Sequence, residues 1–178
     1  ILNLLYLWAI AFFAAGCSKE HVQVSPLVIA HRGNCGGFPE NSARAFDACV
    51  DAGITAVEID VYLTRDDSVF IIHNLDVAQY TGWNGQTQDY TAAELKAGIL
   101  AKTGAISLTF DDFHARYKEK FAYVYIDLKE GQGYEKQMRV MNKIGTLTRD
   151  NPGTCRYVAT CTSLNPIDAI ITIDTTII

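Results

Sequence analysis

The stretch that decides the fold is ITAVEIDVYLTRDDSVFIIH, residues 54–73. Its two apolar, β-branched runs, 54–63 and 68–72, predict strands. The few residues between them are too short for a parallel crossover, which needs a dozen or more. The second run is therefore expected to return antiparallel to the first as a hairpin. Counting back from the turn pairs His73 roughly with Glu58.

Outside this hairpin, strand and helix patterns alternate along the chain. The continuous apolar run 27–30 predicts a strand buried on both faces. Alternation of this kind predicts a parallel sheet with helices outside it. Further strands are expected at 121–128 and 156–161. Helices are expected at 41–52, capped by Asn41 or Ser42, and at 133–148 and from Pro166. Two more helices, at 91–97 and 109–118, are expected to begin with the capping boxes Thr91/Glu94 and Thr109/Asp112.

Polar side chains follow the ends of several predicted strands. Glu58 and Asp60 are two residues apart in one strand, so both point to the same face. Active sites of (β/α) barrels are built at the carboxyl ends of the strands. The polar residues at these positions are His31, Arg32, Glu58, Asp60, His73, Asp127 and Lys129.

Three acids from these strand ends would repel one another if they converged. A hard divalent cation such as Ca²⁺ or Mg²⁺ would relieve the repulsion between Glu58, Asp60 and Asp127. The alternative is a structural salt bridge from Glu58 or Asp127 to Lys129 or Arg32. Spacing alone leaves both interpretations open.

Several short motifs, in this order, resemble the glycerophosphodiester phosphodiesterases. That family's pattern runs HRG, PENT, E-x-D, TKDG, HD and IEIK. The resemblance implies a TIM (β/α) barrel of the phospholipase-C-like phosphodiesterase type, in which about 74–105 is the family's insertion. The matching segments here are IAHRG (29–33), PENS (39–42), VEIDV (57–61), TRDD (64–67), IH (72–73) and IDLK (126–129).

The resemblance also implies roles for individual residues. Asp127 stands where most members have Glu, Asn74 replaces the Asp that follows the second histidine, and Asp67 replaces a turn glycine. Asp tolerates the left-handed conformation, so the turn should survive. The implied roles are a catalytic pair (His31, His73), ligands of one divalent cation, Ca²⁺ or Mg²⁺ (Glu58, Asp60, Asp127), phosphate contacts (Arg32, Lys129), and groups near the metal or behind its ligands (Glu40, Asn74).

The implied reaction is metal-dependent hydrolysis of a glycerophosphodiester to glycerol 3-phosphate and an alcohol such as choline or ethanolamine. One histidine would deprotonate the nucleophile and the other would protonate the departing alcohol. Two alternatives remain. One is a phospholipase D or sphingomyelinase D-like enzyme of the same superfamily. The other is a non-enzymatic phosphodiester-binding lipoprotein, degenerate at Asn74 and Asp127.

The first sixteen residues carry no charge and are expected to be a signal peptide, although a buried helix is the alternative. The sequence Ala14-Ala15-Gly16-Cys17 resembles a bacterial lipobox, in which the cysteine receives the lipid. Residues 17–26 would then be a tether. These features predict an exported bacterial lipoprotein, held at a membrane surface in the periplasm or on the cell surface.

Composition and length limit the remaining possibilities. The net charge of −5 gives no electrostatic footprint for nucleic acid, and oligomeric state is left open. A TIM barrel typically takes roughly 250 residues. The 178 residues here are therefore expected to hold the first four or five strands, with the domain 27–178 truncated at its C-terminal end. Cysteines 35, 49, 155 and 161 could pair in three ways. Cys49, in a helical pattern, is expected to be a small core residue.

Overall fold

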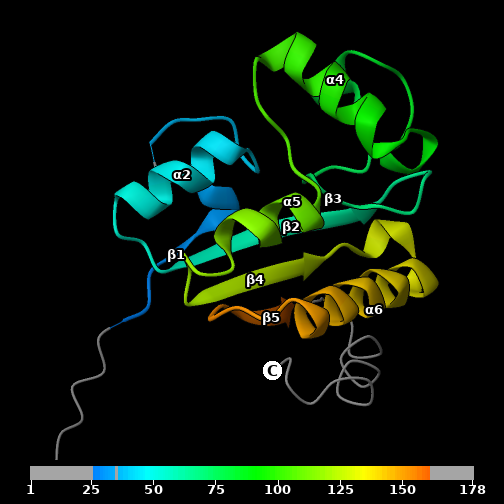
Figure 1. Cartoon of the computed structure of the whole chain (residues 1–178). Helices are drawn as coiled ribbons and strands as arrows, with labels where there is room; N and C mark the ends of the chain where they lie inside the picture. Colours follow the sequence, from blue (N-terminus) through cyan, green and yellow to red (C-terminus); the bar gives the residue numbers. More distant parts are fainter. Residues whose placement is uncertain (1–25, 35, 161–178) are drawn as a thin grey trace, which may run out of the picture.

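The computed structural model describes residues 26–34 and 36–160 of the chain. A five-stranded sheet forms its centre, with strand order β1-β2-β4-β5 and every neighbour on this path parallel (Figure 1). The short strand β3 pairs antiparallel with β2. The strands are β1 (Ile29–Ala30), β2 (Ala56–Leu63), β3 (Val69–Ile71), β4 (Tyr123–Leu128) and β5 (Arg156–Thr160).

Three of the helices, α2, α4 and α5, begin at caps that the sequence predicts. Ser42, rather than Asn41, caps the first long helix by accepting a hydrogen bond from the Ala45 N–H. Both predicted capping boxes are present. The helix expected at 91–97 continues to Thr103. The helical segments are η1 (His31–Gly33), α2 (Ala43–Asp51), α3 (Ala78–Thr81), η2 (Thr87–Asp89), α4 (Ala92–Thr103), α5 (Phe110–Tyr117), η3 (Glu130–Gln132) and α6 (Tyr134–Asp150).

Two apolar clusters hold these elements together. The larger joins one face of the sheet to α2, α5 and α6. The smaller lies in residues 74–105, where Val77, Leu95 and Ile99 pack against the hairpin residues Phe70 and Ile72. Figure 1 shows α4 standing away from the helices that cover the sheet. The stretch 74–105 thus folds as a small unit anchored on the β2–β3 hairpin.

The alternation of side chains along β4 defines the second face of the sheet. Ile126 and its alternate neighbours enter the large core, whereas Asp127 points to the opposite face. The register pairs Asp60 with Asp127 in parallel. The predicted hairpin is confirmed by the antiparallel pair Val61 and Ile71. Asp67 lies in the hairpin turn with a φ of 61°. This is the left-handed conformation expected of an Asp that replaces a turn glycine.

One expected strand differs from the structure. The strand predicted at 27–30 is shorter, and Val28 is 63% exposed rather than buried on both faces. Among the described residues β1 is an edge strand with β2 on one side only, so its apolar side chains lack a second neighbour. The expectation that Cys49 is a core residue is confirmed, since it is fully buried in the larger apolar cluster, and its sulfur takes part in a disulfide. Cys155 is a free thiol.

Several expectations fall on parts of the chain outside the described residues. These are the signal peptide, the lipidation site Cys17, most of the tether, Cys35, Cys161 and the helix from Pro166. Within the described part, no helix combines the length and hydropathy needed to cross a bilayer.

A substitution at Gly33 tests how closely η1 packs against the core. At its φ of +68°, an added Cβ would lie 2.7 Å from the Phe46 ring in the core. Gly37 has a similar φ of +76° and no atom within 4 Å of the same position. We expect Gly33→Ala to lower the free energy of unfolding by about 1–3 kcal/mol more than Gly37→Ala, because only the first adds overpacking to backbone strain. Urea denaturation measures both, and equal losses would contradict the packing argument.

Candidate active site

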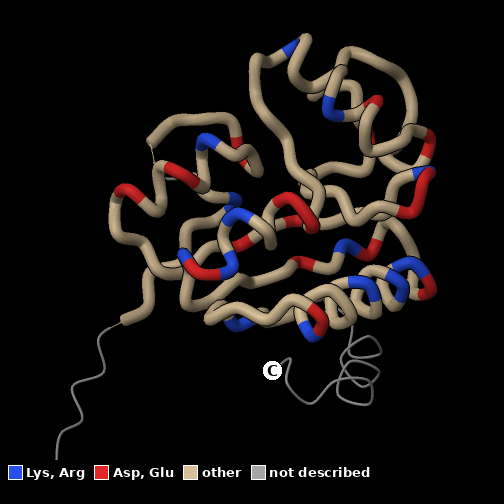
Figure 2. Tube along the Cα trace, viewed as in Figure 1, with Lys and Arg blue, Asp and Glu red and all other residues tan. Residues whose placement is uncertain are grey.

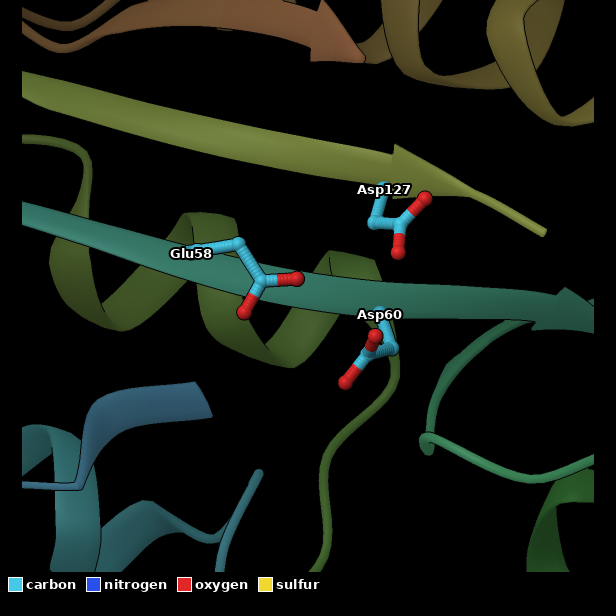
Figure 3. Close-up of side chains that lie close together, drawn as sticks. All are labelled: Glu58, Asp60 and Asp127. Atoms are coloured by element: carbon cyan, nitrogen blue, oxygen red, sulfur yellow. The ribbon is translucent and has the colours of Figure 1, made fainter. Parts of the chain in front are cut away.

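Three acidic side chains gather on the face of the sheet that lies opposite the main core (Figure 3). Glu58 and Asp60 come from β2, and Asp127 comes from the neighbouring strand β4. One oxygen from each lies within 4.8 Å of the others. The convergence that the sequence predicts for these acids is confirmed. Figure 2 shows acidic and basic segments adjoining where β4 ends.

Asp60 is the most deeply buried member of this acidic cluster, with no exposed surface. Its Oδ2 accepts a hydrogen bond of 2.8 Å from the Asn41 side-chain amide. Its Oδ1 lies 2.7 Å from Lys129 Nζ, and Arg32 Nε lies 3.5 Å from Oδ2. A carboxylate without contact to water needs such partners, since burying an unpaired charge is very costly.

Arg32 reaches the cluster through an uncommon backbone conformation. Its φ of 55° lies in the left-handed region that disfavours side chains with a Cβ. Two hydrogen bonds hold it there. Its N–H donates to Glu58 Oε2 at 2.9 Å, and its carbonyl accepts from the Asn41 N–H at 2.9 Å. This strain at the end of β1 aims both the backbone and the guanidinium at the acids.

Lys129 connects the acids of the two strands. Its ammonium contacts Asp127 Oδ2 as well as Asp60 Oδ1. Burial lowers the pKa of Lys129, but hydrogen bonds to these two carboxylates outweigh burial and leave the pKa above its ordinary value. The Lys129 ammonium and a bound cation would therefore contact the same carboxylates, those of Asp60 and Asp127.

The charge balance of the cluster favours an additional cation. Counting Glu40, which pairs with Arg32 at 3.0 Å, four carboxylates face the two permanent cations Arg32 and Lys129. Burial, followed by repulsion from Asp60, raises the pKa of Glu58 to about 7. The donor set consists of carboxylate oxygens, which suit Ca²⁺ or Mg²⁺. The residues therefore fit one divalent cation held by Glu58, Asp60 and Asp127.

The two predicted histidines are placed differently. His31 Nε2 lies 3.8 Å from Glu58 Oε2, and its side chain is largely exposed, so it borders the cluster on the solvent side. The pairing of the hairpin ends at Val61 and Ile71. His73 lies two residues further on, in the bend after β3, so the ladder does not reach the expected pair of His73 with Glu58. The approach of the His73 side chain to the acids stays a prediction.

Glu40 and Asn74 lie beyond the acids, on the side of the insertion. Glu40 pairs with Arg32 and accepts a hydrogen bond of 3.3 Å from the Tyr80 hydroxyl. Burial and the Glu40 charge raise the pKa of Tyr80 to about 12, which keeps this hydroxyl protonated. The backbone of Asn74 acts in the opposite direction and lowers the pKa of Tyr80. Tyr80 thus connects the insertion to the acidic cluster through Glu40 and Arg32.

Sequence reasoning missed the roles of Asn41 and Gln132. Asn41, expected only as an alternative helix cap, instead holds Asp60. Its left-handed φ of 54° is typical of Asn, but that signal does not reveal the partner. The buried Gln132 amide accepts from the Leu63 N–H and donates to the Val61 carbonyl, at 3.1 and 3.2 Å. It extends the β2 ladder beyond the end of β4 and fixes the turn after Lys129; no sequence signal predicts this.

The chain matches the profile of the glycerophosphoryl diester phosphodiesterase family over residues 31–159. It belongs to this family. The described parts of the candidate site, from His31 through Lys129, all lie within the matched range of this phosphodiesterase-family chain. The resemblance carried by the motifs is therefore confirmed.

Curated relatives of this phosphodiesterase-family chain share about a third of their aligned residues with it. A glycerophosphodiester phosphodiesterase of Bacillus altitudinis is 36% identical over 86 residues, which are 46% of this chain and 35% of that protein. A lysophospholipase D of Rattus norvegicus is 34% identical over 67 residues, 38% of this chain and 21% of that protein. The match thus spans about a third or less of these two relatives.

Solved structures show the same fold. A glycerophosphodiester phosphodiesterase from Thermotoga maritima has a TM-score of 0.67 at 22% identity, covering 85% of this chain and 60% of that one. A phosphodiesterase from Oleispira antarctica, solved with the product sn-glycerol-3-phosphate, has a TM-score of 0.69 at 22% identity, covering 85% and 64%. The described sheet is thus the corresponding part of a TIM barrel, as predicted.

The raised pKa of Glu58 gives a pH-dependent prediction. Folded Glu58 holds its proton up to about pH 7, whereas unfolded Glu58 loses it near its ordinary, lower pKa. The folded state binds more protons in that window, so this group's contribution to stability falls as pH rises through it. The stability of the wild type in chelator should therefore fall between about pH 5 and 7.5. Thermal melts should show a smaller fall in stability over this range for Glu58→Gln.

Saturating Ca²⁺ should also flatten the wild-type decline, because the cation favours the ionised carboxylate. Identical pH profiles for the wild type and Glu58→Gln in chelator would contradict the assignment of the raised pKa to this residue.

Proposed function

We propose that the protein hydrolyses glycerophosphodiesters to glycerol 3-phosphate and an alcohol, using a divalent cation and two histidines. The observation that carries the proposal is the three-carboxylate cluster with Arg32 and Lys129 beside it, inside the family match. Glu58, Asp60 and Asp127 would hold Ca²⁺ or Mg²⁺. The bound ion would neutralise the phosphodiester and the charge that grows on its oxygens in the transition state.

Residues of the chain would contact the phosphate and transfer the protons. Arg32 and Lys129 bring two fixed positive charges to the phosphate oxygens, and the strained backbone of Arg32 holds its guanidinium in position. His31 borders the cluster on its exposed side, where an imidazole can exchange protons near neutral pH. One histidine of the pair His31 and His73 takes the proton of the nucleophile, and the other protonates the departing alcohol.

A second candidate is cleavage of lysophospholipids at the same bond. It is favoured by the relative named lysophospholipase D, which aligns with residues of this chain at 34% identity. Glycerophosphocholine and lysophosphatidylcholine separate the two candidates, because only the second carries an acyl chain. Preferential release of choline from lysophosphatidylcholine would support the second candidate over the first.

The catalytic proposal predicts the effect of changing His31. In the protein expressed from its full gene, glycerophosphocholine hydrolysis should require Ca²⁺ or Mg²⁺ and stop with chelator. His31→Ala should lower kcat by about 10²-fold, the usual contribution of one acid–base group. Release of glycerol 3-phosphate measures the rate. Activity that persists undiminished in chelator would contradict the metal requirement.

Two substitutions of Asp127 distinguish a role as a metal ligand from a structural role in hydrogen bonding. Asp127→Asn should lose the cation, because one anionic ligand is removed while the side-chain shape is kept. Asp127→Glu should be tolerated and should raise metal affinity if the shorter acid holds the ion less tightly. Asp51→Asn is the matched control, since Asp51 is exposed at the end of α2. Isothermal titration with Ca²⁺ measures all three, and unchanged affinity in Asp127→Asn would refute the ligand role.

We also propose that the protein is exported and anchored by a lipid on Cys17. The uncharged residues 1–16 and the Ala-Ala-Gly-Cys sequence support this. The disulfide of Cys49 supports it independently, because disulfides persist in oxidising compartments. An anchor of this kind would hold the catalytic domain near phospholipid-derived substrates at the membrane surface.

Labelled fatty acid in a bacterial host tests the anchor. Incorporation is expected in the wild type and in Cys155→Ala, which makes the same change at a free thiol of the folded domain. It should be lost in Cys17→Ala, because the acceptor sulfur is gone. Labelling of Cys17→Ala at the wild-type level would rule out this attachment site.

A further inference from the structure

The protein uses only part of the Arg32 guanidinium. Its Nη1 donates to Glu40 Oε2 at 3.0 Å, and its Nε faces Asp60 Oδ2 at 3.5 Å. Among the described residues, none accepts a hydrogen bond from Nη2. A guanidinium presents a planar fork of N–H donors that matches the oxygens of a phosphate. Nη2 is therefore the nitrogen of Arg32 that remains for a phosphate oxygen.

Glu40 holds Arg32 by one carboxylate oxygen only. Arginine and carboxylate side chains frequently form a bidentate pair, in which both carboxylate oxygens accept. Elsewhere in this chain, both oxygens of Glu94 contact Arg65 Nη2, at 3.1 and 2.9 Å. In Glu40 the second oxygen, Oε1, instead accepts a hydrogen bond of 3.3 Å from the Tyr80 hydroxyl. The hydroxyl thus occupies the oxygen that would otherwise complete a bidentate pair with Arg32.

The packing of the insertion fixes the position of Tyr80. The residue lies in α3, and its side chain packs against the smaller apolar cluster. Lys102 of α4 donates to the Ala78 carbonyl at 2.7 Å and so attaches α3 to α4. Burial and the Glu40 charge raise the pKa of Tyr80 to about 12, so the hydroxyl remains a donor at neutral pH.

Glu40 has room to turn if this hydroxyl is removed. Its side chain is 36% exposed, and Glu40 and Tyr80 both line a cavity of about 270 Å³ beneath the insertion. Among the described residues, only Arg32 and Tyr80 donate hydrogen bonds to the Glu40 carboxylate. The Tyr80 hydroxyl is therefore the contact that keeps this carboxylate from turning toward Nη2 of Arg32.

We propose that Tyr80 is a positioning residue for phosphate binding, which keeps Glu40 on one nitrogen of Arg32 and leaves Nη2 open to a phosphate oxygen of the substrate. The inference rests on the proposed function and adds to it a role for the insertion. If the contact served only to attach the insertion, its loss would lower stability and leave phosphate binding unchanged.

Isothermal titration of sn-glycerol 3-phosphate into the Ca²⁺-loaded protein, expressed from its full gene, tests this. Tyr80→Phe keeps the ring and removes only the hydroxyl. It should weaken glycerol 3-phosphate binding about tenfold, the effect of one charge-assisted hydrogen bond, and leave Ca²⁺ affinity unchanged. In a Glu40→Gln background the same substitution should have no effect, because a neutral amide does not form the charged bidentate pair with Arg32.

Tyr134→Phe is the matched control, since Tyr134 is exposed at the start of α6, and it should change neither affinity. Reaction rates give a second measurement. Arg32 would contact the phosphate in the ground state and the transition state alike, so Tyr80→Phe should raise KM for glycerophosphocholine about tenfold and leave kcat unchanged. Thermal melts verify that each variant is folded.

The outcomes separate the inference from the function beneath it. Wild-type affinity for glycerol 3-phosphate in folded Tyr80→Phe would overturn the inference. An equal loss of affinity in the wild-type and Glu40→Gln backgrounds would also overturn it, because the hydroxyl would then not act through Glu40. Neither result contradicts the proposed function. If the Ca²⁺-loaded wild type neither binds glycerol 3-phosphate nor hydrolyses glycerophosphocholine, the proposed function fails and the inference fails with it.

Discussion

The burial of the Asp60 carboxylate is the constraint on which the site depends. A carboxylate with no exposed surface is tolerated only where donors and cations surround it. Asn41, Arg32 and Lys129 come from three separate segments to meet this need. The strained backbone after β1, the turn before α2 and the end of β4 are thereby tied to one point on β2. The same contacts that stabilise the charge assemble the cluster.

The acids and the insertion form one connected system rather than two neighbouring parts. From Asp60, contacts run through Arg32 to Glu40 and then to Tyr80 of the insertion. Asn41 makes a parallel connection, from Asp60 to the wall of the cavity beneath the insertion.

Local signals made much of this predictable. The i, i+2 spacing of Glu58 and Asp60 fixes their shared face, and the short turn fixes the hairpin. Non-local contacts were not predictable. No periodicity in the sequence indicates that Gln132 hydrogen-bonds the end of β2. Nor does it indicate that the Asn41 side-chain amide donates to Asp60 and does not cap α2. The exposure of Val28 likewise depends on which strand lies beside β1, a property of the sheet and not of the apolar run.

We infer that the three carboxylates form a site for one divalent cation, which competes with the Lys129 ammonium for the oxygens of Asp60 and Asp127. Calcium titration of the wild type, Asp60→Asn and Lys129→Met measures this most directly. We expect one Ca²⁺ per chain in the wild type, loss of binding in Asp60→Asn, and tighter binding in Lys129→Met, because the competing ammonium is removed. Absence of Ca²⁺ and Mg²⁺ binding in both the wild type and Lys129→Met would contradict it and leave the cluster as a structural ion-pair network.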